Sequence, residues 1–188
     1  MDFEILHALQ GIRTELLDSI MLALTTLGDG GVLWITTGVL LLAIPAVGKE
    51  QAEHVRMRRT MGICILLSLL LNLICGNLII KNIVKRPRPY QVDTSVIPLI
   101  FPSEYSFPSG HTSSSFAAAC AIFLHNKKAG IAAFVVAAVI AFTRLYLFVH
   151  YPTDVLGGMI LGIICAIIVN YGVKKLISRY EQKKATEN

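Results

Sequence analysis

Charged residues are scarce in this chain. Only 15% of its 188 residues are Asp, Glu, Lys or Arg, whereas 54% are hydrophobic; an ordinary soluble domain carries about 25% charged residues. The hydrophobic residues fall in long runs, and roughly 20 apolar residues are enough to span a bilayer as a helix. This composition disfavours a soluble globular protein and predicts one integral-membrane domain over residues 1–188.

Other features that would indicate a different class are also missing. The four cysteines lie inside apolar runs, without the spacing of a metal site or a disulfide framework. No basic tract alternates with aromatic residues, so the net charge of +5 is not expected to bind nucleic acid. The N-terminal segment lacks a basic region before a short apolar core, which argues against a cleaved signal peptide.

The apolar runs predict an all-α, six-transmembrane-helix bundle. Residues 1–12 mix apolar and polar positions and are interpreted as an interfacial helix. A long loop at residues 81–108 contains five prolines, and residues 178–188 form a polar tail that is expected to fray. The expected spans are Leu16–Leu27, Val32–Val47, Thr60–Ile80, Ser109–Leu124, Ala129–Val149 and Pro152–Ile177.

Six spans place both termini on one side of the membrane. The linker at 49–59, the turn at 125–128 and the tail are all basic and share that side, which the positive-inside rule makes cytoplasmic. The loop at 81–108 then faces the periplasm or the cell exterior. Basic residues near this outer face breach the rule, and binding of an anion would explain them.

A histidine and a carboxylate stand at the start of the last span. Pro152 suits the first turn of a helix, so His150 lies just before it and Asp154 lies within its first turn. Four residues apart, the two side chains can meet. A carboxylate on one ring nitrogen fixes the tautomer and leaves the other nitrogen free as a nucleophile. A chance pair or a capping pair is the alternative.

A second histidine opens the fourth span, in the tetrapeptide Pro108-Ser109-Gly110-His111. Ser109 is a suitable N-cap, and Gly110 lets a ligand approach the backbone. The free N–H groups of a helix start suit phosphate oxygens. His111 could then protonate a leaving oxygen as a general acid; an ordinary cap beside an interfacial histidine is the alternative.

Three cations occupy the same expected face. Arg88 lies between two prolines on extended chain and can grip phosphate with its planar fork, while Lys81 supplies a point charge. Arg144 lies six residues before His150 inside a span, where a cation is costly and usually functional. Snorkelling is the alternative for Lys81. Lys85 and Arg86 are interpreted as headgroup contacts.

Taken in order, these segments resemble the three-part signature of the type 2 phosphatidic acid phosphatases. This superfamily also includes bacterial acid phosphatases and vanadium haloperoxidases. The matching segments are Lys81-x6-Arg88-Pro89, Pro108-Ser109-Gly110-His111 and Arg144-x5-His150-x3-Asp154. Thr143 stands where the family usually has Ser, which keeps the hydroxyl.

The resemblance implies a role for each residue. His150 would form a phosphohistidine oriented by Asp154, and His111 would protonate the leaving group and then activate water. No metal and no cofactor would be needed. The phosphate oxygens would be held by Lys81, Arg88, Ser109, Gly110 and Arg144.

The expected activity is hydrolysis of a membrane lipid phosphate, with undecaprenyl diphosphate favoured if the source is bacterial. Phosphatidylglycerophosphate and phosphatidate are the alternatives. A lipid phosphotransferase and a non-enzymatic lipid-phosphate carrier are the rival classes. Gly158 and Gly162 are interpreted as close helix packing, with a homodimer through these glycines as the alternative.

Overall fold

The computed structural model describes residues 2–45 and 52–186. The end of the second expected span and residues 49–51 of the basic linker lie outside this range. All regular structure within it is helical, as predicted. The elements are α1 (Asp2–Gln10), α2 (Glu15–Thr26), η1 (Asp29–Gly31), α3 (Val32–Ala43), α4 (Ala52–Asn72), η2 (Leu73–Ile80), α5 (Lys81–Val84), α6 (Pro89–Val92), α7 (Gly110–Phe123), α8 (Lys127–Tyr146) and α9 (Pro152–Thr186).

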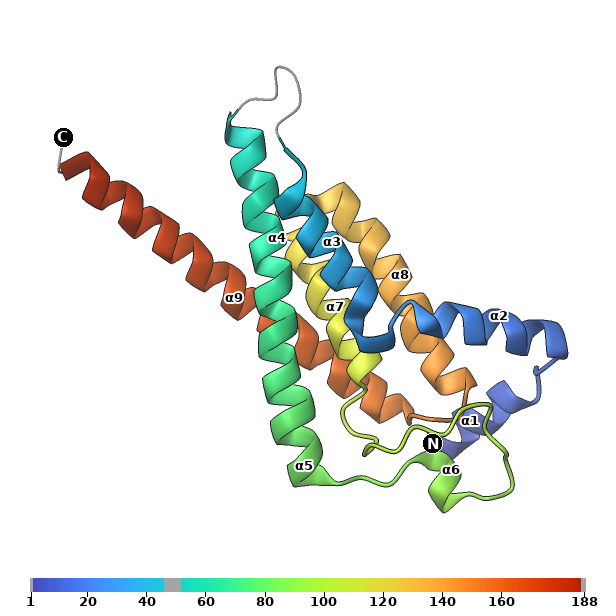
Figure 1. Ribbon diagram of the computed structural model, residues 1–188. Helices are drawn as coiled ribbons and strands as arrows, with labels where there is room; N and C mark the ends of the chain where they lie inside the picture. Colours follow the sequence, from blue (N-terminus) through green and yellow to red (C-terminus); the bar gives the residue numbers. More distant parts are fainter. Residues whose placement is uncertain (1, 46–51, 187–188) are drawn as a thin grey trace.

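Helix α7 forms the centre of the bundle. It packs against α4, α8 and α9, and α3 lies along α4 and also contacts α7 (Figure 1). Its 14 residues include a run of fully buried alanines at 117–119, and small side chains let neighbouring helices approach closely. The N-terminus of α7 lies at the same end of the bundle as the first residues of α5 and α9 (Figure 1).

Two glycines on α9 fix the contact with α7. A Cβ at Gly158 would lie 2.8 Å from the carbonyl oxygen of Ser109, and a Cβ at Gly162 would lie 2.2 Å from that of Ser113. Only glycine fits at separations this short. The interpretation as close packing within the chain is confirmed, because α7 covers both glycines, and the homodimer stays a prediction.

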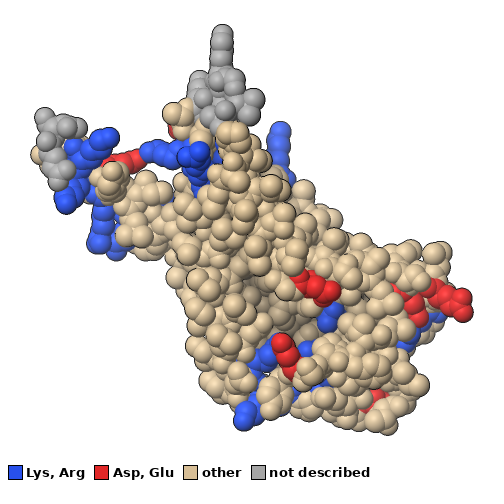
Figure 2. Space-filling view, in the orientation of Figure 1, with Lys and Arg blue, Asp and Glu red and all other residues tan. Residues whose placement is uncertain are grey.

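Four described stretches are long and apolar enough to cross a membrane. They are Glu15–Ala43, Ala52–Val92, Lys127–Tyr146 and Pro152–Thr186. Figure 2 agrees with this assignment, because the middle of the visible face is largely uncharged and Lys and Arg side chains gather toward its ends. The protein is a multi-pass membrane protein.

The first expected span differs from the structure. Helix α2 lies across the end of the bundle instead of running along it, and α1 packs beside it against α8 and α9 (Figure 1). Its polar residues explain why: Arg13 donates to Asp18 at 2.9 Å and the Tyr146 hydroxyl donates to Asp18 at 2.7 Å. Charges that pair at the end of the bundle hold α2 there.

Helix α1 and the last described turn of α9 lie at opposite ends of the bundle (Figure 1), whereas the sequence predicts that both termini face one side of the membrane. Asp2 accepts hydrogen bonds from Arg86 and Thr153, at the end where α9 begins. Glu181 pairs with Arg56, close to the first residue of α4 at the other end. Residues 178–186 of the tail that was expected to fray are helical, because α9 continues to Thr186.

Candidate active site

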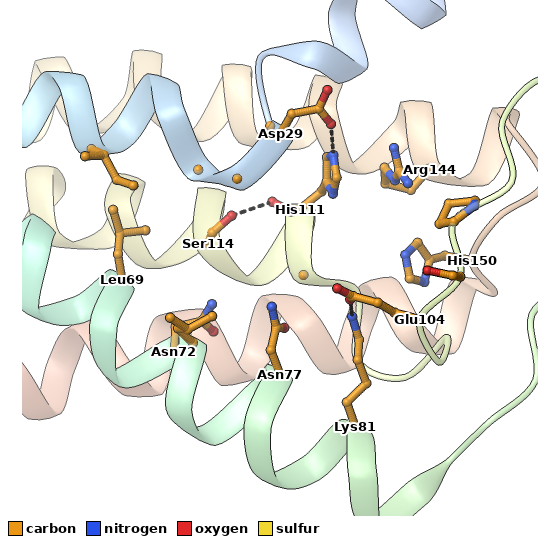
Figure 3. A pocket seen from close by; sticks show the side chains of 18 of the residues that line it. Asp29, Leu69, Asn72, Asn77, Lys81, Glu104, His111, Ser114, Arg144 and His150 are labelled. Atoms are coloured by element: carbon orange, nitrogen blue, oxygen red, sulfur yellow. Dashed lines mark hydrogen bonds and ion pairs between the residues drawn. The ribbon is translucent and has the colours of Figure 1, made fainter.

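A cavity of about 690 Å³ opens where the helix starts converge. It is lined at one end by Lys81, Arg88, Gly110, His111, Arg144 and His150, which are six of the eight site residues predicted from the sequence (Figure 3). The opposite wall is mainly apolar, although Asn72 and Asn77 also line it. It is formed by Ile35 of α3, Leu66, Leu69 and Leu70 of α4, and Leu73 of η2. The cavity is thus polar and cationic at one end and hydrocarbon-like at the other.

His150 is held in the turn between α8 and α9. Phe148 takes a left-handed conformation there, with φ 59°, which brings the following residues back toward the bundle. The imidazole is 2% exposed, with Nε2 3.2 Å from a guanidinium nitrogen of Arg88. Burial, aided by Arg88 and Arg144, lowers the pKa of His150 to about 3, although Asp154 opposes this. The ring is therefore neutral at pH 7, as a nucleophile requires.

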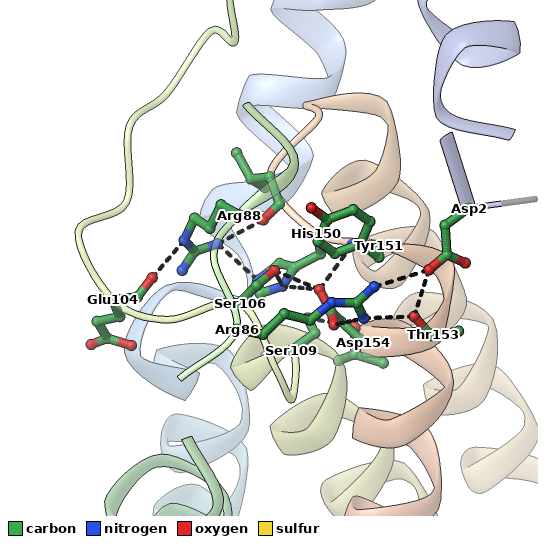
Figure 4. Close-up of polar contacts among 12 residues, drawn as sticks. Asp2, Arg86, Arg88, Glu104, Ser106, Ser109, His150, Tyr151, Thr153 and Asp154 are labelled. Carbon is green, nitrogen blue, oxygen red and sulfur yellow. Dashed lines mark hydrogen bonds and ion pairs between the residues drawn. The ribbon is translucent and has the colours of Figure 1, made fainter. Parts of the chain in front are cut away.

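Asp154 lies behind His150, outside the cavity. Its Oδ2 lies 3.5 Å from Nδ1 of His150, at the limit of a hydrogen bond. The hydroxyl of Ser106 lies between the two, donating to the carboxylate at 2.5 Å and lying 3.4 Å from Nδ1 (Figure 4). The backbone N–H of Tyr151 also donates to Oδ2, at 2.9 Å. The expected His–Asp pair exists, and a serine joins it.

Arg86 was expected to contact lipid headgroups, but in the structure it binds side chains of the protein. Its guanidinium donates to Oδ1 of Asp154 at 2.7 Å and to the hydroxyl of Thr153 at 2.7 Å (Figure 4). It also donates to Asp2 at 3.1 Å and stacks over the Tyr151 ring at 3.8 Å. Arg86 thus neutralises the fully buried Asp154 carboxylate and ties α1 to the start of α9.

The three cations among the five predicted phosphate ligands are almost completely buried. Lys81, Arg88 and Arg144 are 6%, 3% and 2% exposed. Arg88 is fixed by the backbone oxygens of Glu104 and Val149, at 2.7 Å and 2.8 Å. Because burying a cation without an anion is costly, three cations around one cavity indicate an anion-binding site.

Protein groups pair with Lys81 and Arg88, but they satisfy Arg144 only in part. Lys81 donates to the Glu104 carboxylate at 2.5 Å, and this bond lowers the pKa of Glu104. Arg144 donates to Thr25 of α2 at 2.5 Å. Within the part of the chain that the structure describes, its buried Nε has no hydrogen-bond partner. A phosphate oxygen in the cavity would provide one.

The three predicted site residues at the start of α7 do not all face the cavity. Gly110 and His111 line the cavity, but Ser109 does not. The Ser109 hydroxyl accepts from Thr112 at 2.9 Å, and its N–H donates to the backbone oxygen of Asp154 at 3.2 Å. Ser109 therefore joins α7 to α9, and its predicted contact with phosphate stays a prediction.

No three His, Cys, Asp or Glu side chains within residues 2–45 and 52–186 are grouped to hold a metal ion. The expectation of metal-independent chemistry stays a prediction.

Comparison with known proteins decides the family. A family model described as the PAP2 superfamily matches residues 61–178, which include all eight predicted site residues. The chain belongs to the PAP2 superfamily.

Three relatives of this PAP2 protein show how far the likeness extends. The undecaprenyl-diphosphatase BcrC of Bacillus subtilis is 29% identical over 89% of this chain and 82% of its own length. The crystal structure of Aquifex aeolicus LpxE superposes with a TM-score of 0.70, at 29% identity, over 89% of this chain and 93% of that one. A PAP2-type phosphatidylglycerolphosphate phosphatase from Bacillus subtilis gives a TM-score of 0.62 at 28% identity, over 93% of this chain and 85% of that one.

Sequence reasoning gave no role at the site to Asp29, Glu104 or Ser106, and it gave Arg86 a different role. Arg86 and Glu104 are in the long loop, where prolines hide any helical spacing. Ser106 is a single serine in an irregular segment, and no local pattern distinguishes it. A carboxylate beside two glycines in a short turn, at Asp29, is also typical of an ordinary turn.

Proposed function

We propose that this PAP2 phosphatase hydrolyses a lipid phosphate or diphosphate through a phosphohistidine on His150. The observation that carries the proposal is the shared cavity. His150 and His111 line it together with Lys81, Arg88 and Arg144, so one phosphorus atom could meet a nucleophile, a proton donor and three cations. Fixed cations aimed at the transferring phosphoryl group would stabilise the charge that develops on it.

The proposed reaction has two steps. In the first, Nε2 of His150 attacks the terminal phosphorus, the bond from that phosphorus to the oxygen of the leaving lipid alcohol or lipid phosphate breaks, and protonated His111 gives that oxygen its proton. In the second, His111 takes a proton from water, the hydroxide attacks phosphorus, and the phosphorus–nitrogen bond breaks. Inorganic phosphate leaves, and His150 returns to its neutral form. Asp154 and Ser106 would hold Nδ1 throughout, close to their present separations of 3.5 Å and 3.4 Å from it.

The apolar wall of the cavity favours a lipid over a small phosphate ester. Ile35, Leu66, Leu69 and Leu70 extend away from the cationic end along α3 and α4, where an acyl or prenyl chain could lie. Among lipids, undecaprenyl diphosphate is our first choice, because BcrC is similar over most of both chains. Phosphatidylglycerophosphate is the second, because of the structural neighbour with that activity.

Phosphate release from purified protein in detergent tests the proposal. Undecaprenyl diphosphate, phosphatidylglycerophosphate and phosphatidate are compared for wild type and His150→Ala. We expect release from at least one lipid and its loss in the variant. Activity that survives His150→Ala would contradict the proposed nucleophile, and a phosphoryl group recovered on an alcohol instead of as free phosphate would favour the phosphotransferase alternative. Lipid binding or transport without turnover would favour the carrier.

We also propose that the cavity faces the periplasm or cell exterior. The opposite end of the bundle carries the basic residues Arg56, Arg58, Arg59, Lys127 and Lys128, which the positive-inside rule places in the cytoplasm. Residues 1–188 would form one domain, with 1–12 at the interface, 81–108 as the outer active-site loop and the tail at 178–188 cytoplasmic. The N-terminal helix α1, packed beside the site, would then be outside.

Cysteine labelling in intact cells tests this orientation. The four native cysteines are replaced first, and a single cysteine is then placed at the exposed Thr94 of the loop or at the exposed Lys128. An impermeant thiol reagent should modify Thr94→Cys in intact cells and Lys128→Cys only after lysis. The reverse pattern would overturn the proposed sidedness.

A further inference from the structure

A carboxylate from outside the three signature segments contacts His111. Oδ1 of Asp29, in the short turn η1 between α2 and α3, lies 2.8 Å from Nε2 of His111 (Figure 3). The two residues are 82 positions apart in the chain, and both line the cavity. The fold therefore brings together a second histidine–carboxylate pair, beside the one formed by His150 and Asp154.

The turn that carries Asp29 is packed directly onto His111. A Cβ at Gly28 would lie 2.6 Å from Cδ2 of His111 and 2.9 Å from Cγ2 of Ile140, so only glycine allows this approach. Gly30 and Gly31 follow with φ of 57° and 69°, the left-handed region that glycine enters without strain. Three glycines around one carboxylate set the position of Asp29 against the imidazole.

We propose that Asp29 is a positioning residue for His111, a role that rests on the proposed phosphatase function. The carboxylate would hold Nε2–H, so that Nδ1 is the nitrogen that gives its proton to the leaving lipid oxygen. Asp29 would stabilise the imidazolium before this transfer. Afterwards, neutral His111 would keep its proton on Nε2, and the free Nδ1 could take a proton from water in the second step. No proton passes to Asp29 in either step.

A similar pair elsewhere in the chain provides the control. Asp93 lies 2.9 Å from Nε2 of His7, again joining a carboxylate to a histidine of a distant segment. Neither residue lines the cavity. Asp93→Asn therefore removes the same kind of bond from a histidine with no proposed role in the reaction.

The test compares substrates that differ in their need for a general acid. Phosphatidate releases an alkoxide, which must be protonated, whereas p-nitrophenyl phosphate releases a stable phenolate. The quantity measured is kcat/KM, because it covers the steps up to departure of the leaving group. General acid catalysis contributes about 10²- to 10⁴-fold. Asp29→Asn should lose roughly tenfold or more of kcat/KM with phosphatidate, a part of that range, and clearly less with the aryl ester.

Controls separate this role from a structural one. Asp93→Asn should keep wild-type values with both substrates, and Asp29→Glu should recover part of the activity with phosphatidate. If Asp29→Asn fails to fold, Asp29→Glu takes its place in the test. It should then lose more kcat/KM with phosphatidate than with the aryl ester, although the loss should be smaller than that expected for Asp29→Asn. Equal losses with both substrates in a folded Asp29 variant, or no loss with either, would overturn the proposal.

The outcomes also distinguish this proposal from the one on which it rests. Wild-type protein that releases phosphate from neither substrate nor any lipid of the panel would refute the proposed function itself. An active wild type whose His111→Ala variant loses activity equally with both substrates would refute His111 as the acid. An active wild type with a substrate-dependent loss in His111→Ala, but not in Asp29→Asn, would refute the part assigned to Asp29 alone.

Discussion

Ser106→Ala removes one hydroxyl from behind the proposed nucleophile. This hydroxyl donates to Oδ2 of the buried Asp154 at 2.5 Å and lies 3.4 Å from Nδ1 of His150. The Asp154 carboxylate would keep Arg86 and the Tyr151 N–H, so the variant should fold. A hydrogen bond to a charged group contributes about 1.5 to 3 kcal/mol. If the transition state depends on that bond, kcat should fall roughly 10- to 100-fold.

The assay is phosphate release from the best lipid of the panel, with kcat and KM determined separately. We expect KM to change little, because Ser106 does not line the cavity. Ser95→Ala is the matched control, since Ser95 makes a comparable bond of 2.6 Å to the Asp93 carboxylate in the same loop, away from the site. An unchanged kcat in Ser106→Ala, or an equal loss in Ser95→Ala, would refute the reasoning that Ser106 holds the His–Asp pair.

Two further predictions concern stability, measured by thermal unfolding in detergent. The pKa of His150 in the folded protein, about 3, lies below its usual value of 6.5, so the unfolded chain binds the extra proton between these values. The stability that neutral His150 contributes is fully present above pH 6.5 and declines as the pH falls below that value. His150→Asn should therefore lose less stability than wild type between pH 7 and pH 5. An identical loss in the two proteins would contradict this. Gly162→Ala should destabilise the protein by about 1 to 3 kcal/mol through its clash with Ser113. Gly172→Ala on the same helix, where a Cβ meets nothing within 4 Å among the described residues, should be neutral or slightly stabilising, and similar losses in the two variants would argue against the clash.

The sequence predicted most of what depends on local patterns. Long apolar runs predicted the helices, and Ser109 and Pro152 predicted where two of them begin. Because those helix starts share one end of the bundle, six of the eight predicted site residues reached one cavity. Hydropathy could not predict the direction of α2, because a tertiary contact, the hydrogen bond from Tyr146 to Asp18, holds it at the end of the bundle.

The contacts behind the site could not be predicted from spacing. Arg86 reaches Asp154 across 68 positions, and Asp29 reaches His111 across 82. Ser109 lies at the predicted N-cap of α7, but its hydrogen bonds could not be predicted from that position. Its hydroxyl accepts from Thr112, and its N–H donates to the backbone oxygen of Asp154. A motif places a residue near a site, whereas packing of distant segments decides which way its polar atoms point.

Trapping the covalent intermediate tests the central claim most directly. Wild-type protein is mixed with lipid carrying a labelled terminal phosphate, denatured within milliseconds under alkaline conditions, in which phosphohistidine survives, and digested for peptide mass spectrometry. The account predicts a phosphoryl group on His150, absent from His150→Ala. Label on another side chain, or turnover without label on any residue, would contradict it.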